Sequence, residues 1–263
     1  MKKVQMSNSQ YHANPALGST GIKLLAQRPS LFKAQVIDGI QEEKYCFNIG
    51  SAFHSITLEP EKFEEEFVVS ELDRRTNAFK DFVKEHTGQT IIKPADYEMV
   101  GAMRDGVLRN DTAYKLLNQK SETEMSYFWT DRLTQTECKC RPDALIRHQK
   151  GLIAVDLKST QDAGKEGFRR SVGQYRYDIQ AAWYSMGISI VEETPVDLFV
   201  FIVTEKTPPY DTGVYYLSDQ ALNTGLKDCK NALDTYKRCV ETDTWPGLPE
   251  GLIEINLPAW ATA

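Results

Sequence analysis

The first 120 residues of the chain carry apolar residues at the three- and four-residue spacing typical of amphipathic helices. This spacing predicts helices over 21–27, 30–39, 47–58, 77–85 and 95–108. Ser19 or Thr20 is in place to cap the first of these helices, and Pro29 is in place to open the second. The N-terminal part is therefore predicted to be largely helical.

From about residue 122 the pattern changes to short apolar runs bounded by polar or glycine-containing turns. These runs predict strands over 124–130, 138–148, 152–160, 196–205 and 212–218. Helical spacing returns over 177–188 and 219–240. This order predicts an α/β fold in which a central mixed β-sheet is flanked by helices.

No internal repeat, low-complexity tract or linker rich in glycine and proline divides the chain. We therefore expect one domain over 1–263, with a mainly helical part over 1–120, an α/β core over 120–240 and a C-terminal tail over 241–263. The chain has 263 residues, 41% of them hydrophobic, which is enough for one sizeable core.

The composition also bears on location. No stretch approaches the ~18 consecutive apolar residues of a membrane-spanning helix, and no apolar run follows the lysines near the start. Five cysteines form an odd and scattered set, which argues against a disulfide framework and fits a reducing compartment. Cys138 and Cys140 share one strand face, but no second pair at zinc-finger spacing accompanies them. We expect a soluble, cytoplasmic protein without a membrane partner.

The candidate chemistry lies in two neighbouring predicted strands. Pro142-Asp143 is in the first strand, Asp156-Leu157-Lys158 is in the second, and a turn around 149–151 separates them. If these strands pair as a hairpin, the two aspartates meet, and the two-residue period places Asp156 and Lys158 on one face. Two carboxylates brought together need a cation, and Mg²⁺ or Mn²⁺ has the required preference for oxygen ligands. With the lysine, such a site has the groups needed for phosphodiester hydrolysis.

A structural alternative exists for the same residues. An Asp-x-Lys triplet occurs by chance, so Asp143 in a turn and a solvent-exposed Asp156–Lys158 pair would also fit. Against this, Asp156 stands inside an apolar run, where a carboxylate faces inward and is usually paired or metal-bound. The net charge of −6 and pI of about 5.4 oppose general binding of nucleic acid. A local basic channel on an acidic exterior answers that objection.

The two segments Arg-Pro-Asp and Val-Asp-Leu-Lys together resemble the core motif of PD-(D/E)xK nucleases. Gln180-x-x-x-Tyr184 resembles the QxxxY motif of their RecB-like branch, and Gly50-x-x-x-His54 resembles the segment whose histidine approaches the metal. A purely structural role on a buried helix face stays open for His54, Gln180 and Tyr184. The resemblance implies catalytic roles for Asp143, Asp156, Lys158, Glu124, Gln180 and Tyr184. It implies a metal site of His54, Asp143, Asp156 and the backbone carbonyl of Leu157, with Glu124 joined through water.

Nearly the whole chain, from the Tyr11-His12 segment to 257–261, resembles the C-terminal nuclease domain of the exonuclease VIII (RecE) family. This implies Mg²⁺-dependent, processive 5′-to-3′ digestion of linear double-stranded DNA, leaving 3′ single-stranded overhangs for recombination by strand annealing. It also implies a ring-shaped homo-oligomer and a RecT-like annealing protein as partner. A ring would expose its basic lining to the DNA. Candidate phosphate-binding residues are Ser19, Thr20, Arg74, Arg75 and Lys80.

Two rival functions share parts of this pattern. The same core serves endonucleases of restriction or repair type, and a catalytically inactive DNA-binding module would retain the fold alone. The joint presence of the motif residues disfavours the inactive module. An iron–sulfur cluster is excluded by ligand count, because only Cys229 and Cys239 follow the core. The string at 18–23 lacks the spacing of a phosphate loop, so no nucleotide cofactor is expected.

Overall fold

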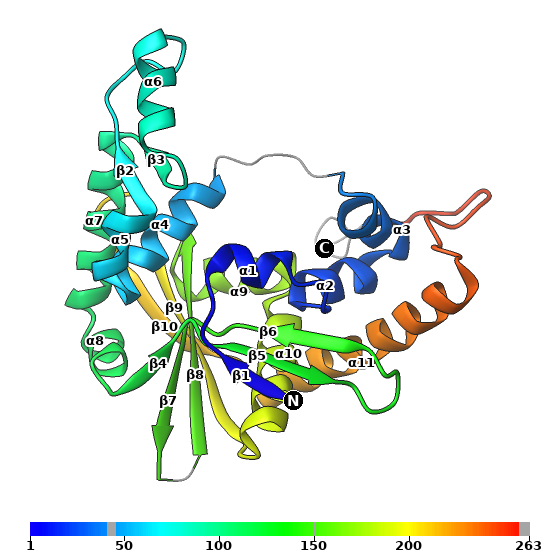
Figure 1. Cartoon of the computed structure of the whole chain (residues 1–263). Coiled ribbons are helices and arrows are strands. Elements are labelled where there is room, and N and C mark those ends of the chain that lie inside the picture. Colours follow the sequence, from blue (N-terminus) through cyan, green and yellow to red (C-terminus); the bar gives the residue numbers. More distant parts are fainter. Residues whose placement is uncertain (41–45, 150, 258–263) are drawn as a thin grey trace.

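A five-stranded sheet forms the centre of the protein in the computed structural model, which describes residues 1–40, 46–149 and 151–257 (Figure 1). Strands β8 and β9 run parallel, and every other neighbouring pair is antiparallel. The prediction of an α/β fold with a mixed central sheet is therefore confirmed. The strand order is β10 (Thr212–Tyr216), β9 (Val196–Glu205), β8 (Gly151–Thr160), β7 (Ala144–His148) and β4 (Ser121–Thr123).

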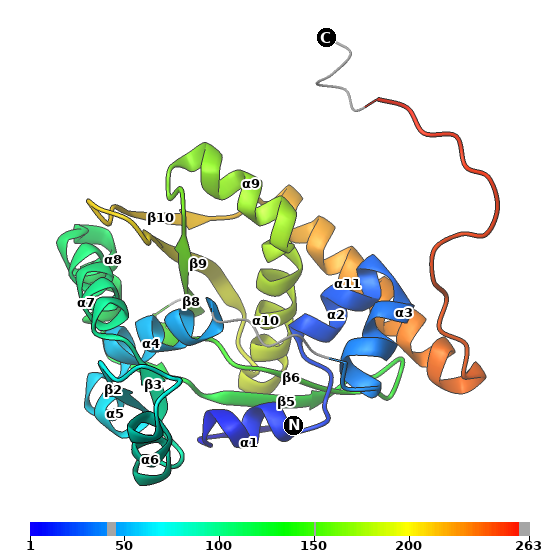
Figure 2. The ribbon, with the colours of Figure 1, turned by 90° about the horizontal axis from the view of Figure 1, so that it is seen from above.

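The two faces of this sheet carry separate cores because side chains alternate along β8. Leu152 and Ala154 enter a core that includes residues of α10 (Tyr177–Glu192) and α11 (Asp219–Thr242). Val155 and Leu157 enter the opposite core, with residues of α4 (Cys46–Leu58) and α7 (Pro94–Arg109). Figure 2 shows these two helix pairs on opposite sides of β8 and β9. The same alternation places Asp156 on the α10 side of the sheet.

A smaller, three-stranded sheet has the order β1 (Lys2–Val4), β5 (Ser126–Thr130) and β6 (Glu137–Cys140). The prediction of one strand over 138–148 is wrong, because the chain leaves this sheet after Cys140 and joins the central sheet at Ala144. Proline lacks the amide N–H that a strand ladder needs, and Pro142 lies at the break. Asp143 consequently lies immediately before β7 and not inside a strand.

The N-terminal part is largely helical, as predicted. Pro29 opens a helix as expected. The expected side-chain cap is wrong: the residue before the first turn of α2 is Gly18, and no side chain caps this helix. Ser19 is instead the first helical residue. The remaining elements here are α1 (Asn8–Ala13), α2 (Ser19–Gln27), α3 (Pro29–Phe32), a π-helical turn (Lys33–Ile37), α5 (Pro60–Glu66) and α8 (Asp111–Leu117).

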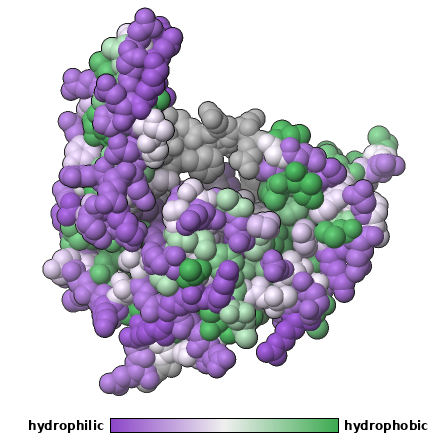
Figure 3. All heavy atoms as spheres, in the orientation of Figure 1, coloured by the Kyte–Doolittle hydropathy of each residue, from purple (hydrophilic) through white to green (hydrophobic). Residues whose placement is uncertain are grey.

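A projecting arm carries α6 (Asn77–Glu85) at its tip, beside the parallel pair β2 (Phe67–Val69) and β3 (Thr90–Ile92) (Figure 1). The bounds of α6 are those predicted from the apolar spacing, whereas the two short strands were not predicted. No residue of α6 is buried. Hydrophilic side chains dominate this arm in the space-filling view (Figure 3), so the helix faces solvent.

Two features complete the C-terminal half. Helix α9 (Lys165–Tyr175) was not predicted, because it buries only Gly167 and Phe168 and so lacks a full apolar stripe. After α11, residues 243–257 form neither helix nor strand. The resemblance to the RecE family extends to 257–261, and residues 258–261 lie outside the described part of the chain. Within the described part of the chain, no helix is both long enough and apolar enough to cross a membrane.

Candidate metal centre

Asp143 is fixed at the open end of the β7–β8 hairpin. Pairing of Ala144 with Val155 brings Asp143 beside Asp156, as the hairpin prediction required. The backbone N–H of Leu157 donates to Oδ2 of Asp143 at 2.5 Å. The backbone N–H of Glu124 donates to the carbonyl of Asp143 at 3.1 Å. Main-chain N–H groups thus hold both the carboxylate and the backbone carbonyl of Asp143, and its Oδ1 remains for other partners.

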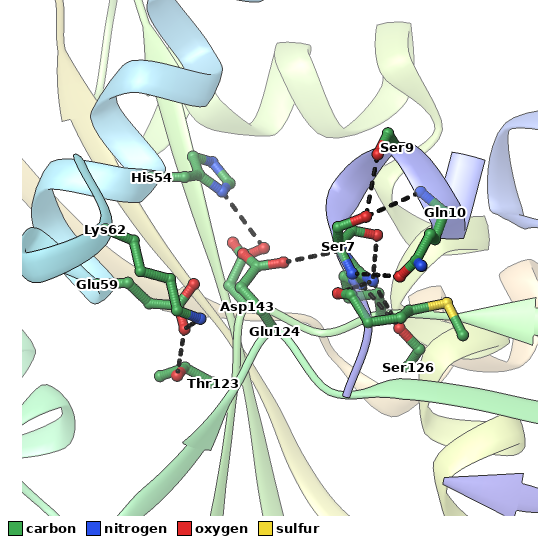
Figure 4. Close-up of polar contacts among 12 residues, drawn as sticks. Ser7, Ser9, Gln10, His54, Glu59, Lys62, Thr123, Glu124, Ser126 and Asp143 are labelled. Carbon is green, nitrogen blue, oxygen red and sulfur yellow. Dashed lines mark hydrogen bonds and ion pairs between the residues drawn. The ribbon is translucent and has the colours of Figure 1, made fainter. Parts of the chain in front are cut away.

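Three side chains that can ligate a metal converge at this point. His54 of α4, Glu124 from the turn after β4, and Asp143 each place one donor atom within 4.8 Å of the other two. Figure 4 shows His54 pointing from its helix toward Asp143, and Nδ1 of His54 lies 3.3 Å from Oδ1 of Asp143. Glu124 has a φ of 52°, an uncommon conformation for a residue other than glycine. Strain of this kind concentrates at functional sites.

The electrostatics of these three side chains favour a cation. Burial and the neighbouring Asp143 carboxylate raise the pKa of Glu124 to about 8. Burial lowers the pKa of His54, but the Asp143 carboxylate outweighs it and the pKa is raised to about 9. Burial also raises the pKa of Asp143, yet His54 and Lys158 together hold it below its usual value. The metal-free cluster therefore holds protons that a divalent ion would displace.

Asp156 and Lys158 form a buried ion pair beside this cluster. Only 2% of Asp156 is exposed, and its Oδ2 contacts the Lys158 ammonium. Its Oδ1 accepts a hydrogen bond from Nε2 of Gln180 at 2.7 Å. Burial raises the pKa of Asp156, whereas the Asp156 and Asp143 carboxylates overcome burial and raise the pKa of Lys158. A solvent-exposed Asp156–Lys158 pair, the structural alternative considered above, is therefore wrong.

Gln180 and Tyr184 lie one turn apart on α10 and both face the site. Tyr184 lines the same cavity as His54, Glu124 and Asp143. Its hydroxyl shares a hydrogen bond with the Ser19 side chain. Another side chain, which no motif had indicated, reaches the site from the next turn of α2. The ammonium of Lys23 donates to Oε1 of Gln180 at 3.3 Å.

Two cavities meet at this cluster. The first, here the metal-side cavity, has a volume of about 700 Å³ and is lined by the cluster together with Glu59, Glu65 and Glu66. The second, here the lysine-side cavity, has a volume of about 630 Å³. Its lining includes Lys158, Lys206, Arg170, Tyr175 and Tyr177. Both cavities include Gly50 and His54, so the cluster lies where an acidic hollow joins a basic, aromatic one.

The other predicted phosphate-binding residues, Thr20, Arg74, Arg75 and Lys80, do not line either cavity. Thr20 is exposed on α2. Arg75 pairs with Asp73 at 3.1 Å, just before the helix that carries Lys80 at the tip of the arm. Arg74, next to Arg75, is exposed as well. DNA binding by these residues stays a prediction, as does the metal-ligand role of the Leu157 carbonyl.

The mixed sheet and the acidic cluster at the end of its hairpin define the class, a PD-(D/E)xK-like nuclease fold. Residues 18–254 match the family model described as "PDDEXK-like domain of unknown function (DUF3799)", and the chain belongs to that family. No curated protein matches the chain.

Solved structures were compared with the chain as well. A candidate exonuclease from Eubacterium rectale is similar with a TM-score of 0.60 and 14% identity, over 94% of this chain and 97% of that one. At this identity the likeness supports the fold alone. The protein SSO0001 aligns at 14% identity over 73% of this chain and 88% of that one, but its TM-score of 0.31 carries no argument.

The residues present fit a divalent metal ion. One imidazole nitrogen and two carboxylates are donors that Mg²⁺ or Mn²⁺ accepts, and their mutual repulsion and raised pKa values are relieved by a cation. Among the described residues, the buried Oδ2 of Asp156 has no hydrogen-bond partner apart from the Lys158 ammonium that contacts it. This carboxylate oxygen is thus a further potential ligand at the edge of the group.

Proposed function

We propose that this protein is a metal-dependent exonuclease that hydrolyses linear double-stranded DNA. A nuclease fold implies a nucleic-acid substrate. The observation that carries the proposal is the convergence of His54, Glu124 and Asp143 beside the buried Asp156–Lys158 pair. Metal-ligating donors, a second carboxylate and an ammonium at one point are the groups that phosphodiester hydrolysis requires.

In this proposal His54, Asp143 and Asp156 hold the ion, the Leu157 carbonyl adds a further donor, and Glu124 binds directly or through water. When bound, Mg²⁺ or Mn²⁺ polarises a phosphoryl oxygen and lowers the pKa of water. No iron–sulfur cluster or nucleotide cofactor is required.

The side chains around the ion have distinct tasks in the reaction. Lys158 stabilises the negative charge that develops on the phosphate during attack, and its position is fixed by Asp156 and by the Tyr177 ring, whose centre is 5.1 Å from Nζ. Gln180 orients Asp156 through the hydrogen bond to Oδ1. Tyr184 contacts the substrate backbone from the wall of the metal-side cavity.

The finer functional details rest on the resemblance to the RecE family. We infer 5′-to-3′ polarity, processive digestion that leaves 3′ overhangs, and a ring-shaped homo-oligomer through which DNA passes. The single-stranded product would be taken by a RecT-like annealing protein in recombination.

The test uses linear double-stranded DNA labelled at one 5′ end and a covalently closed circle, each with Mg²⁺ and with EDTA. We expect Mg²⁺-dependent release of short 5′-labelled product from the linear DNA and an intact circle. Cutting of the circle would assign an endonuclease instead, and hydrolysis of neither DNA would refute both. Asp143→Asn should be inactive, whereas Asp105→Asn, on an exposed position of α7, is the matched control.

A further inference from the structure

Two helices meet at the site through matched pairs of residues. Ser19 and Lys23 lie four residues apart on α2, and Gln180 and Tyr184 lie four residues apart on α10. Residues at this spacing share one helix face. Ser19 contacts Tyr184, and Lys23 contacts Gln180 at 3.3 Å. Helix α2 therefore directs Lys23 toward Gln180, whose side chain also donates a hydrogen bond to Asp156.

The ammonium of Lys23 lacks a carboxylate of its own among the described residues. The two carboxylates that influence its pKa are already paired, Asp156 with Lys158 and Asp178 with Arg176. Burial and the Lys158 charge lower the pKa of Lys23 to about 8. The charges around Lys23 are thus already balanced by one another, and Lys23 itself adds a positive charge that no carboxylate pairs with among the described residues.

Two ammonium groups also share one aromatic ring. Nζ of Lys23 lies 5.2 Å from the centre of the Tyr177 ring, and Nζ of Lys158 lies 5.1 Å from it. Asp156 already pairs with Lys158, so the Lys23 ammonium adds a like charge to a partly buried site without an anion of its own, which opposes folding. A methionine or glutamine at position 23 could pack on the ring without this cost. A merely structural role therefore explains the position of Lys23 but not its charge.

We propose that Lys23 binds a phosphate oxygen of the DNA strand, as a second phosphate-binding lysine beside Lys158. The inference rests on the proposed function and names a residue outside the recognised motifs. The anionic phosphate supplies the partner that the Lys23 ammonium lacks, because the neighbouring carboxylates already pair with Lys158 and Arg176. An internal phosphodiester and a 5′-terminal phosphate have the oxygen chemistry in common, and the experiment distinguishes them.

The test measures binding of a fluorescent duplex by anisotropy, with Ca²⁺ in place of Mg²⁺ and at several salt concentrations. Lys23→Met removes one phosphate contact. The slope of log K against log salt should become shallower by about 0.9, and Kd should rise about tenfold. Lys23→Arg should keep the slope. Lys115→Met is the matched control, because Lys115 is exposed on α8, on the far side of the molecule from α2 (Figures 1 and 2).

Two duplexes, with and without a 5′ phosphate, identify the contact. An effect of Lys23→Met on both duplexes assigns an internal phosphodiester, and an effect on the phosphorylated duplex alone assigns the terminal phosphate. If Lys23→Met does not fold, Lys23→Gln replaces it, since the amide can still donate to Gln180 without a charge. An unchanged slope, or an equal change in Lys115→Met, overturns the proposal.

Hydrolysis by the wild-type protein is measured in parallel with Mg²⁺. Wild-type protein that binds DNA but does not hydrolyse it overturns the proposed function and leaves the Lys23 result to be judged by its slope. Wild-type protein that hydrolyses DNA while Lys23→Met binds as the wild type does overturns only the role of Lys23. Absence of binding by the wild-type protein overturns both.

Discussion

Replacing Glu124 by glutamine tests whether the group of His54, Glu124 and Asp143 holds a divalent ion. An ion present at a hundred times its Kd stabilises the folded state by about 2.7 kcal/mol. For a chain of 263 residues this corresponds to a rise in Tm of about 5 °C. If the lost carboxylate weakens ion binding about 10- to 100-fold, the rise should fall to roughly 1–3 °C.

The metal-free Glu124→Gln variant distinguishes a ligand from a structural carboxylate. With a pKa of about 8, Glu124 is largely protonated at neutral pH without metal, so the uncharged glutamine should leave Tm unchanged there and raise it above pH 8, where repulsion from Asp143 sets in. Arg141 lies 3.9 Å from Glu124 but keeps its hydrogen bonds to Ser126 at 2.7 and 2.9 Å. Little ion-pair stability is therefore lost with the charge.

The assay is differential scanning calorimetry with Mn²⁺, with Mg²⁺ and with EDTA. Glu137→Gln, at an exposed position of β6, is the matched control and should keep the full metal-dependent shift. A Glu124→Gln protein that keeps the full shift, or that loses several degrees without metal, would refute the assignment of Glu124 as a ligand.

Three further predictions follow from the same contacts. Asp156→Asn should lower the rate of DNA hydrolysis about a hundredfold or more and lower the stability measured in urea by about 1–3 kcal/mol, since the partly buried Lys158 ammonium loses its carboxylate partner. The metal-dependent rise in Tm should grow from neutral pH toward pH 9. The pKa values of Glu124 and His54 are raised to about 8 and about 9, so protons compete with the ion until both side chains are deprotonated. A rise in Tm that does not change with pH would contradict this. Gly187→Ala should cost about 1–3 kcal/mol in urea unfolding, because the added carbon would lie 2.3 Å from the Trp129 ring.

Asp156 has structural partners besides the proposed metal ion. As a metal ligand alone, it could be replaced by alanine without disturbing a packed apolar contact, and the protein would stay folded and lose activity. In the structure its carboxylate is the buried partner of Lys158 and Gln180. Loss of activity must therefore be separated from loss of stability, and asparagine is the better substitution because it keeps an acceptor for Gln180.

Elements with strong periodicity were predictable because their pattern is local. The ten-residue strand around Asp156 alternates between two cores, and this alternation fixes both its register and the inward direction of the carboxylate. The break between Cys140 and Ala144 was not predictable from hydrophobicity, because apolar residues continue on both sides while the chain changes sheet. Which sheet a strand joins depends on distant partners and not on its own residues.

The residues of the site also differ in how far the sequence alone could predict them. The motif residues Asp143, Asp156 and Lys158 lie close together in the sequence, so hairpin geometry alone predicts that they meet. His54 could be placed only by resemblance, since its helix precedes the hairpin by many residues. Lys23 had no signal, because its role depends on how α2 packs against α10. A lysine at helical spacing from Ser19 is indistinguishable by sequence from a solvent-exposed lysine.

The arrangement of charge around His54 bears on the objection that a chain of net charge −6 should repel DNA. The acidic residues Glu59, Glu65 and Glu66 line the metal-side cavity, where a bound ion would offset them. The lysine-side cavity is lined by Lys158, Arg170 and Lys206 and by one acidic residue, Asp162, which pairs with Arg170 at 3.0 Å. The two hollows adjoin at His54. Under the proposed function, a DNA strand would lie along the lysine-side cavity and reach the ion from there. Such a local gradient concentrates an anionic substrate at the site even when the whole surface is acidic. A ring-shaped assembly would strengthen this effect but is not needed to explain it.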